Sequence, residues 1–339
     1  MRGKMLARLA QLCTVWAGLA DSLRQHHIPQ NETSTRPYDA SSAAFHAMVA
    51  DSASKRAMPK VRGGNPLVIL TFVNNEYRAS LVNWMARMRK LGVDNYEVVC
   101  MDNETAAFME SIGRPCSRAA QVGMGKKKVW EFRLHVLMDL LHEGTDVVLC
   151  DVDAIWLNNP FGFLEKGDIV ASQAYMPFDV SKRLGATACL GWTFFRAAPA
   201  VARFVSEDVM DYFRIDQDDQ IAVNHALLKN GLRFSPSVFN LSSSEIAEGR
   251  AGPLAVRFLD TERFKRSCGK RRSDLDRQRL YVAHCAPHLP QGWTHEAVDR
   301  DEHLKHLGLW FLRIGWEDVP AINNFNTWID RVSVEANPE

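Results

Sequence analysis

Short apolar runs alternate with helical patterns in the first half of the chain. Residues 67–72, 96–101 and 146–150 are mostly apolar, which is typical of strands buried on both faces of a parallel sheet. Between these runs, apolar residues recur at helical spacing and stop at Gly92 and Gly144, where glycine can end a helix. The alternation predicts an α/β fold with a doubly wound, mostly parallel sheet flanked by helices.

Polar side chains stand directly after each predicted strand. Asn74 and Asn75 follow the first strand, Asp102 follows the second, and Asp151 and Asp153 follow the third. Ligands of open α/β sheets bind beyond the carboxyl ends of the strands. These residues are therefore the first candidates for a binding site.

Asp151 and Asp153 are the most informative pair. Residues two apart on an extended segment point to the same side, and two carboxylates that converge there repel each other unless a cation lies between them. Oxygen ligands of this kind suit Mg²⁺ or Mn²⁺, with substrate phosphates completing the coordination. The alternative is a helix-capping role, with Asp153 capping a short turn at residues 154–157. The strand that ends directly before the pair favours the metal site.

Two chemistries use such a pair. In nucleotide-sugar transfer it holds a divalent ion against a diphosphate. In phosphatases of the haloacid-dehalogenase type, the first aspartate is a nucleophile and the second a general acid. A cluster of Asp216, Asp218 and Asp219 could hold the Mg²⁺ of such a phosphatase, but it follows a predicted helix end and not a strand. The nucleophile strand also normally opens that fold, whereas here a long α/β stretch precedes Asp151.

Several segments together resemble the nucleotide-diphospho-sugar transferases, a family that includes plant xylosyl- and arabinosyltransferases. The motif D-V-D-A-I-W-L-N-N-P at residues 151–160 is similar to that family's D-V-D-x-V-W-L-x-D-P. The segments 71–77, 81–84 and 91–96 resemble its opening strand and helix, and G-W-T-F-F-R at 191–196 resembles its N-T-G-F-F-x-x-R. Asp219-Gln220 with Asn224 matches its D-Q-x-x-x-N motif. The resemblance covers roughly residues 67–310.

The resemblance implies a GT-A-type fold and a retaining transfer of a sugar from a nucleoside-diphosphate donor, most simply a UDP-sugar, to a glycan or glycoprotein acceptor. It also implies a Mn²⁺ or Mg²⁺ ion. The expected roles are catalytic for Asp219 and Gln220, and metal-binding for Asp151, Asp153 and His284. The expected donor-binding residues are Asn74, Asn75, Asp102, Arg133, Asp151 and Gly191.

The sequence departs from the family at three places. Cys189-Leu190 stand where the family usually has Asn-Thr, and Arg133 stands where it often has Lys. The segment 284–292, which begins at His284, lacks the lysine that often follows the family's histidine. An inactive glycan-binding pseudo-enzyme is therefore an alternative to an active transferase.

Composition narrows the class of protein. The 339 residues carry 41 Lys+Arg and 40 Asp+Glu, a net charge of +1, and 46% are hydrophobic. These values exclude a disordered chain, and they argue against a protein whose main partner is nucleic acid. The seven cysteines include no C-x-x-C pair, so a zinc knuckle is not expected. Cys100 and Cys150 end two predicted strands and are expected to be buried free thiols.

The first 66 residues are expected to lie outside the catalytic domain. Residues 1–20 are expected to form a weak signal anchor or an amphipathic helix, with membrane attachment possible through residues 5–20, and residues 21–66 read as a stem. The catalytic domain is expected at 67–339. Sequons at Asn31, Asn103 and Asn240 fit a lumenal place in the Golgi or another secretory compartment, with a soluble cytoplasmic protein as the alternative.

Overall fold

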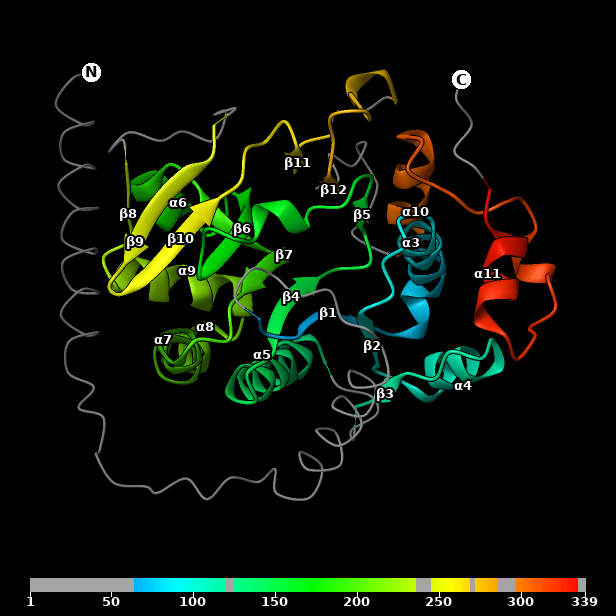
Figure 1. The fold of residues 1–339 in the computed structure, drawn as a ribbon, viewed down its shortest axis with the longest axis horizontal. Helices are drawn as coiled ribbons and strands as arrows, with labels where there is room; N and C mark the ends of the chain where they lie inside the picture. Colours follow the sequence, from blue (N-terminus) through cyan, green and yellow to red (C-terminus); the bar gives the residue numbers. More distant parts are fainter. Residues whose placement is uncertain (1–63, 120–124, 236–244, 269–271, 286–296, 335–339) are drawn as a thin grey trace, which may run out of the picture. The chain divides into compact units, whose positions relative to one another are not determined.

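The computed structural model describes residues 64–119, 125–235, 245–268, 272–285 and 297–334 (Figure 1). The expected anchor at residues 1–20 and all but the last three residues of the expected stem lie outside these ranges. Among the described helices, none combines the length and the apolar character that crossing a bilayer requires.

A nine-stranded sheet forms the centre of the described residues, in the order β3-β2-β1-β4-β7-β6-β10-β9-β8. The strand pairings orient seven of these strands in one direction, with β7 and β9 opposed. The expected mostly parallel α/β sheet is thus confirmed. The strands are β1 (Leu67–Val73), β2 (Tyr96–Cys100), β3 (Ser117–Arg118), β4 (Asp146–Cys150), β6 (Ile169–Ala174), β7 (Thr187–Phe195), β8 (Arg233–Ser235), β9 (Ala247–Ala251) and β10 (Leu254–Phe258).

Helices cover both faces of this sheet. Figure 1 shows α3 and α5 on opposite faces, as right-handed crossovers require when the chain moves from β1 out to β3 and then back to β4. The helices are α3 (Arg78–Lys90), α4 (Asn103–Ser111), α5 (Lys126–His142), α6 (Phe178–Leu184), α7 (Pro199–Arg203), α8 (Met210–Asp216), α9 (Asp219–Lys229), α10 (Ala297–His306) and α11 (Phe325–Val332). Shorter turns are the 3-10 helices η1 (Asn75–Tyr77), η2 (Phe161–Phe163), η4 (Arg272–Asp274) and η5 (Trp316–Asp318), and the π-helical η3 (Phe204–Val209).

A second, three-stranded sheet decides where the functional residues lie. It has the order β11-β12-β5, with β11 at Phe264–Lys265, β12 at Val282–His284 and β5 at Ala154–Trp156. The antiparallel pairing of β12 with β5 sets His284 opposite Ala154. Residues 154–156 are therefore a strand, and Asp153 does not cap the turn considered from the sequence.

A buried arginine anchors β5 to the rest of the fold. Arg87 of α3 donates from Nε to the carbonyl oxygen of Trp156 and from Nη2 to that of Leu157, both at 3.0 Å. The Trp156 ring is fully buried, and its centroid lies 6.2 Å from that of Trp192 on β7. Packing and hydrogen bonding together hold the segment that carries Asp153 between α3 and the large sheet.

The structure corrects one cysteine expectation and confirms another. Cys100 forms a disulfide with Cys116, because β3 pairs with β2 and brings the two Cα atoms to 6.0 Å. A second disulfide joins Cys268 to Cys285. Cys150 is a buried free thiol, as expected.

Removing the first disulfide tests this correction. Because it closes a loop with a sequence separation of 16, Cys100→Ala/Cys116→Ala should lower the free energy of unfolding by about 3 kcal/mol. Cys150→Ala, which removes a buried sulfur without opening a loop, should cost roughly 1 kcal/mol. Urea denaturation of the three proteins measures both effects. Equal stability of the double variant and Cys150→Ala would contradict the disulfide.

Candidate functional site

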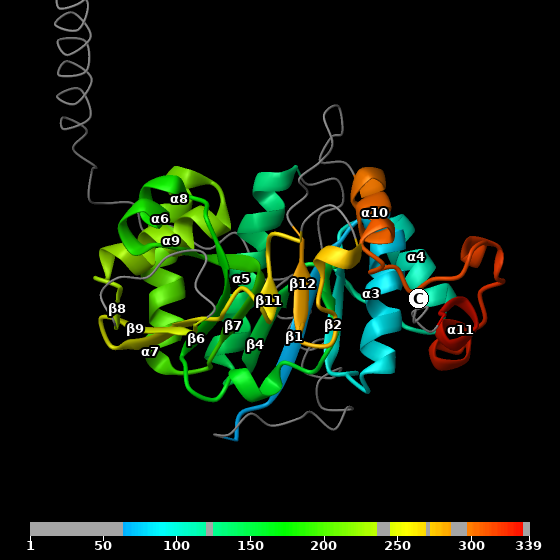
Figure 2. The same ribbon diagram turned by 90° about the horizontal axis from the view of Figure 1, so that it is seen from above.

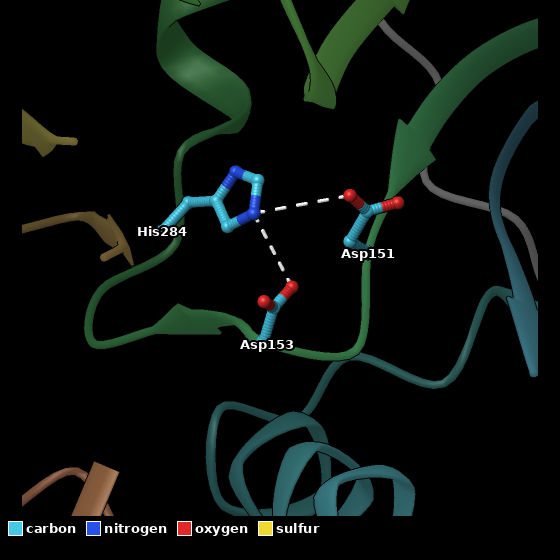
Figure 3. A group of neighbouring side chains, drawn as sticks. All are labelled: Asp151, Asp153 and His284. Atoms are coloured by element: carbon cyan, nitrogen blue, oxygen red, sulfur yellow. Dashed lines mark ion pairs between the residues drawn. The ribbon is translucent and has the colours of Figure 1, made fainter. Parts of the chain in front are cut away.

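Three of the predicted residues converge at the carboxyl end of β4 (Figure 3). Asp151 and Asp153 lie on the connection from β4 to β5, and His284 ends β12. Nε2 of His284 lies 3.2 Å from Oδ1 of Asp153 and 3.8 Å from Oδ2 of Asp151. The register between β5 and β12 produces this convergence across more than a hundred residues of sequence.

The three side chains can hold a divalent cation. Each offers one ligand atom, and the three atoms lie within 4.8 Å of one another. Adjacent ligands around an octahedral Mg²⁺ or Mn²⁺ are about 3 Å apart, since each lies roughly 2.1 Å from the ion. The observed separations require only small side-chain movements to reach this geometry. The donor set of two carboxylates and one imidazole therefore fits the implied metal.

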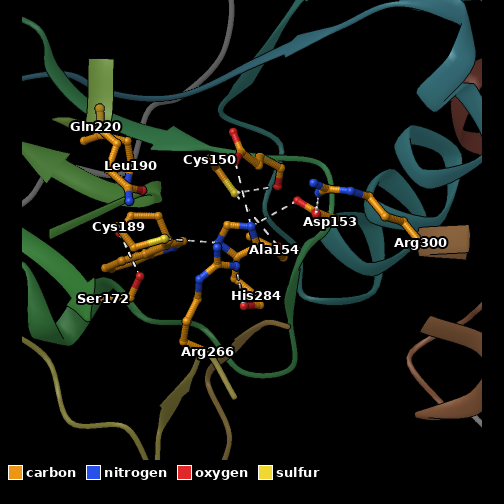
Figure 4. Close-up of polar contacts among 12 residues, drawn as sticks. Cys150, Asp153, Ala154, Ser172, Cys189, Leu190, Gln220, Arg266, His284 and Arg300 are labelled. Atoms are coloured by element: carbon orange, nitrogen blue, oxygen red, sulfur yellow. Dashed lines mark hydrogen bonds and ion pairs between the residues drawn. The ribbon is translucent and has the colours of Figure 1, made fainter. Parts of the chain in front are cut away.

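An arginine from helix α10 enters this cluster. Arg300 forms an ion pair with Oδ2 of Asp153 (Figure 4). Burial alone would raise the pKa of Asp153, but Arg300 and then His284 outweigh it and hold this pKa far below its usual value. Sequence reasoning missed Arg300, because an arginine on a polar, charged helix carries no signal that it points into a site.

Arg133 of α5 joins two other carboxylates. Its Nη1 lies 3.0 Å from Oδ1 of Asp151, and its Nε and Nη2 each lie 2.5 Å from Oδ2 of Asp219. Arg133 and Asp219 are both buried. Burial lowers the pKa of Arg133, but the two carboxylates overcome this and raise it above its usual value. The guanidinium that was expected to bind the donor is thus already engaged by protein carboxylates.

Cys189 and Gly191, the first residue of the G-W-T-F-F-R motif, pack directly on His284. A Cβ added to Gly191 would lie 1.9 Å from Cε1 of His284 and 2.8 Å from Oδ2 of Asp151, so a larger residue would have to displace these two side chains. Sγ of Cys189 lies 3.4 Å from Nδ1 of His284. This contact on one ring nitrogen leaves Nε2 facing the two carboxylates. Burial and Arg266 lower the pKa of His284, but Asp153 and Cys189 outweigh them and raise it to about 9.

The side-chain amide of Gln220 forms hydrogen bonds to two backbone groups, one through its oxygen and one through its nitrogen. Its Oε1 accepts from the backbone nitrogen of Leu190 at 3.2 Å, and its Nε2 donates to the carbonyl oxygen of Met176 at 3.1 Å. The buried Asn224, one turn later on α9, exchanges hydrogen bonds with both backbone groups of Ala188. The D-Q-x-x-x-N motif therefore fixes the backbone of β7 beside the site.

A cavity of about 330 Å³ lies among these residues. It brings together Arg133, Asp151, Gly191, Asp219, Gln220 and His284 of the predicted set, with Trp130, Met176, Leu190, Asp218, Ile221, Arg266 and Arg300. Two of its arginines have unused donors: Nε of Arg266 and Nε of Arg300 are buried and have no hydrogen-bond partner in the part of the chain that the structure describes. These donors suit an anionic ligand.

The remaining predicted residues lie apart from this cavity lining. Asp102 caps α4 by accepting from the backbone nitrogen of Thr105 at 2.7 Å, and its other oxygen accepts from that of Asn75, also at 2.7 Å. These hydrogen bonds outweigh the effect of burial and lower the pKa of Asp102. Oδ1 of Asn74 is buried without a hydrogen-bond partner among the described residues. The ends of β1 and β2 thus form a second polar area.

Comparisons with known proteins agree with this arrangement. The sequence model described as nucleotide-diphospho-sugar transferase matches residues 91–286. The chain is 24% identical over 289 residues to the beta-arabinofuranosyltransferase RAY1 of Arabidopsis thaliana, covering 75% of this chain and 49% of that protein. It is 31% identical over 119 residues to the arabinosyltransferase RRA1 of the same plant, covering 32% of this chain and 29% of that protein. The chain thus spans about half the length, or less, of these relatives.

Similarity to solved structures is lower. A galactosyltransferase LgtC, solved with donor and acceptor sugar analogs, has a TM-score of 0.43 and 10% identity, covering 74% of this chain and 99% of that one. The glycosyltransferase GlyE of Streptococcus pneumoniae TIGR4 has a TM-score of 0.42 and 10% identity, covering 80% of this chain and 65% of that one.

Gly191→Ala tests the close packing at the cluster. The added methyl group should displace His284 and Asp151, and affinity for Mn²⁺, measured by isothermal titration calorimetry, should fall at least tenfold. The matched control is Gly162→Ala, where nothing lies within 4 Å of the added carbon. It should bind Mn²⁺ like the unmodified protein. Unchanged Mn²⁺ affinity in Gly191→Ala would remove His284 and Asp151 from the metal site.

Proposed function

This chain belongs to the nucleotide-diphospho-sugar transferase family, and we propose that it is a metal-dependent, retaining glycosyltransferase. It transfers a sugar from a UDP-sugar to a glycan or glycoprotein acceptor. The observation that carries the proposal is the convergence of Asp151, Asp153 and His284 at one edge of a cavity that also holds Asp219 and unused arginine donors. The names of the relatives make an arabinose the first donor sugar to test.

The proposed metal site serves the leaving group. Asp151, Asp153 and His284 would hold a Mn²⁺ or Mg²⁺ ion, and this ion would supply Lewis-acid stabilisation of the departing diphosphate. The imidazole nitrogen favours Mn²⁺ over Mg²⁺ because nitrogen is the softer ligand. Cys189 and Gly191 support this arrangement, since one contacts the far nitrogen of His284 and the other leaves room for the ring.

Arg300 and Arg266 bind the diphosphate. Both line the cavity, and the Nε of each is buried with its donor unused by the described residues. Arg300 also neutralises Asp153 in the free protein. A cation held by Asp153 would compete with this ion pair, and the guanidinium of Arg300 would then be free to bind phosphate oxygens. Hydrogen bonds of this kind are among the stronger ones in proteins, because the donor and the acceptor are both charged.

Asp219 faces the reacting sugar. Retaining transfer develops positive charge at the anomeric carbon, and a buried carboxylate stabilises this charge electrostatically. Arg133 fixes the Asp219 carboxylate with two nitrogens at 2.5 Å and joins it to Asp151. Gln220 holds the backbone around the sugar in place through Leu190 and Met176. In this arrangement Arg133 positions carboxylates and reaches the donor only through them.

The nucleoside lies toward the ends of β1 and β2. Asn75 and Asp102 are joined there by a hydrogen bond of 2.7 Å, and Oδ1 of Asn74 is a buried acceptor with no partner among the described residues. A uracil ring offers an N–H donor to such an acceptor. A position on this side of Asp151 leaves the diphosphate between the nucleoside and the metal cluster.

The two alternative functions have less support. The phosphatase has less support because the family match is to sugar transferases. A pseudo-enzyme would be expected to lack part of the machinery. Here the departure at Cys189 leaves the three metal-binding side chains and Asp219 in place.

A secretory location fits this function. Two disulfides, Cys100–Cys116 and Cys268–Cys285, are typical of proteins that fold in an oxidising compartment. We therefore keep the Golgi or another lumenal compartment as the proposed location. Attachment to a membrane through residues 5–20 remains part of the same proposal.

A donor screen tests the proposed function. The full chain is incubated with Mn²⁺ and UDP-arabinofuranose, UDP-xylose, UDP-galactose, UDP-glucose or GDP-mannose, with and without a mixture of methyl glycosides as acceptors, and free UDP or GDP is measured. We expect the highest release from UDP-arabinofuranose, loss with EDTA and recovery with Mn²⁺. Asp153→Asn should lower the rate at least a hundredfold, because it removes an anionic ligand.

The same screen separates the alternatives. Release of phosphate from p-nitrophenyl phosphate without any release of nucleotide would favour the phosphatase. Binding of methyl glycosides without any release of nucleotide would favour the pseudo-enzyme.

Arg300→Gln tests the dual role of Arg300. Without the guanidinium, Asp153 is free, so affinity for Mn²⁺ alone should rise several-fold, while affinity for UDP in saturating Mn²⁺ should fall about tenfold. Calorimetry measures both. Lys305→Gln, an exposed change on the same helix, should alter neither affinity. A fall in both affinities would instead assign Arg300 a purely structural role.

A further inference from the structure

Exposed apolar side chains gather at one place beside the cavity. Six large hydrophobic residues are exposed in the described part of the chain, and three of them lie within four consecutive positions: Tyr175 at 42%, Met176 at 38% and Phe178 at 56%. The concentration matters, because single exposed hydrophobic residues are ordinary whereas a cluster marks a contact surface. We call these three residues the aromatic rim.

The aromatic rim is continuous with the proposed catalytic cavity. Tyr175 directly follows β6, Met176 lines the cavity, and Phe178 begins α6. The carbonyl oxygen of Met176 accepts hydrogen bonds from Nε2 of Gln220 at 3.1 Å and from Oγ1 of Thr187 at 2.8 Å. The backbone of the rim is thus fixed to the residue that also holds Leu190 beside the metal cluster.

The two rings form a stacked pair. The centroids of Tyr175 and Phe178 lie 5.8 Å apart with an interplanar angle of 23°. Each ring partly covers the other, and both stay strongly exposed. The pair therefore offers apolar ring surface next to the tyrosine hydroxyl, and the mutual contact limits the freedom of both side chains before any ligand binds.

The rim lies on the side of the cavity away from the proposed nucleoside position. In the sheet, β7 and β6 follow β4 on one side, whereas β1 and β2 lie on the other. Figure 2 likewise shows α6 and α10 on opposite sides of β4. A donor that extends from the ends of β1 and β2 to the metal cluster leaves the rim free for the second substrate.

We propose that Tyr175, Met176 and Phe178 form the acceptor subsite and bind a sugar ring of the acceptor glycan by stacking. The proposal rests on the proposed function. A sugar ring carries C–H groups on its faces and hydroxyls around its edge, so it fits an aromatic face that borders a polar cavity. Apolar contact at the rim combines with hydrogen bonds from the cavity, which is the usual composition of a small-molecule site.

Methyl glycosides serve as probes of the rim. Saturation-transfer NMR on the full chain, without donor, measures binding of methyl α-L-arabinofuranoside, methyl β-D-galactopyranoside and methyl β-D-xylopyranoside. Acceptor-stimulated release of UDP then gives the acceptor KM. Tyr175→Ala and Phe178→Ala should each weaken glycoside binding and raise this KM at least fivefold. Affinity for UDP and release of UDP without acceptor should stay within twofold of the unmodified protein.

Three controls separate stacking from other effects. Phe178→Tyr keeps an aromatic face and should restore binding. Ile314→Ala removes a comparably exposed apolar side chain from another part of the fold and should change nothing. Sedimentation velocity shows whether the rim instead joins two copies of this chain, in which case Phe178→Ala would lower the oligomeric state.

Several outcomes would overturn the proposal. They are an unchanged KM in both alanine variants, no saturation transfer to any of the glycosides, or a shift from dimer to monomer in Phe178→Ala. Failure of the proposed function gives a different pattern, with neither binding of UDP nor release of nucleotide in the unmodified protein. The glycoside measurement does not need a donor, so it still decides the role of the rim in that case.

Discussion

Buried carboxylates must be matched by nearby positive charge, and this constraint shapes the centre of the structure. Asp153 and Asp219 are both nearly excluded from solvent, where an unpaired carboxylate would be strongly unfavourable. Arg300 neutralises the first and Arg133 the second, and Arg133 also reaches Asp151. The free protein is thus close to electrical balance at its cavity. A divalent cation and a diphosphate can enter together without leaving a net charge, whereas either alone disturbs the balance.

The backbone makes this charge arrangement possible. Asp151 lies at the end of β4 in the large sheet. His284 lies beside it only because β12 pairs with β5 in a separate small sheet. Arg87 of α3 fixes the position of β5 by donating hydrogen bonds to the carbonyl oxygens of Trp156 and Leu157. The absence of a side chain at Gly191 then lets the imidazole approach. Hydrogen bonding, burial and a single glycine together fix three ligand atoms that no local stretch of chain could bring together.

The cavity has two different sides. Beyond its lining, toward the ends of β1 and β2, lies the polar area of Asn75 and Asp102, and Met176 in its lining belongs to the segment that carries the exposed rings of Tyr175 and Phe178. Gln220 links the metal side to the aromatic side, because its amide holds the backbone of Leu190 and that of Met176. A transferase requires such a division, since two substrates of different chemistry must meet at one reacting carbon with water excluded.

The sequence by itself determined the elements that depend on local pattern. Continuous apolar runs predicted β1, β2 and β4, and polar residues after them marked the edge where Asp151 and Asp153 lie. The motif predicted the family. Only the tertiary structure decided that Cys100 is a disulfide partner, that Arg300 pairs with Asp153, and that exposed rings border the cavity. The physical reason is that strand periodicity and motifs are short-range properties of the chain. Ion pairs, disulfides and exposure arise when packing joins segments far apart in sequence.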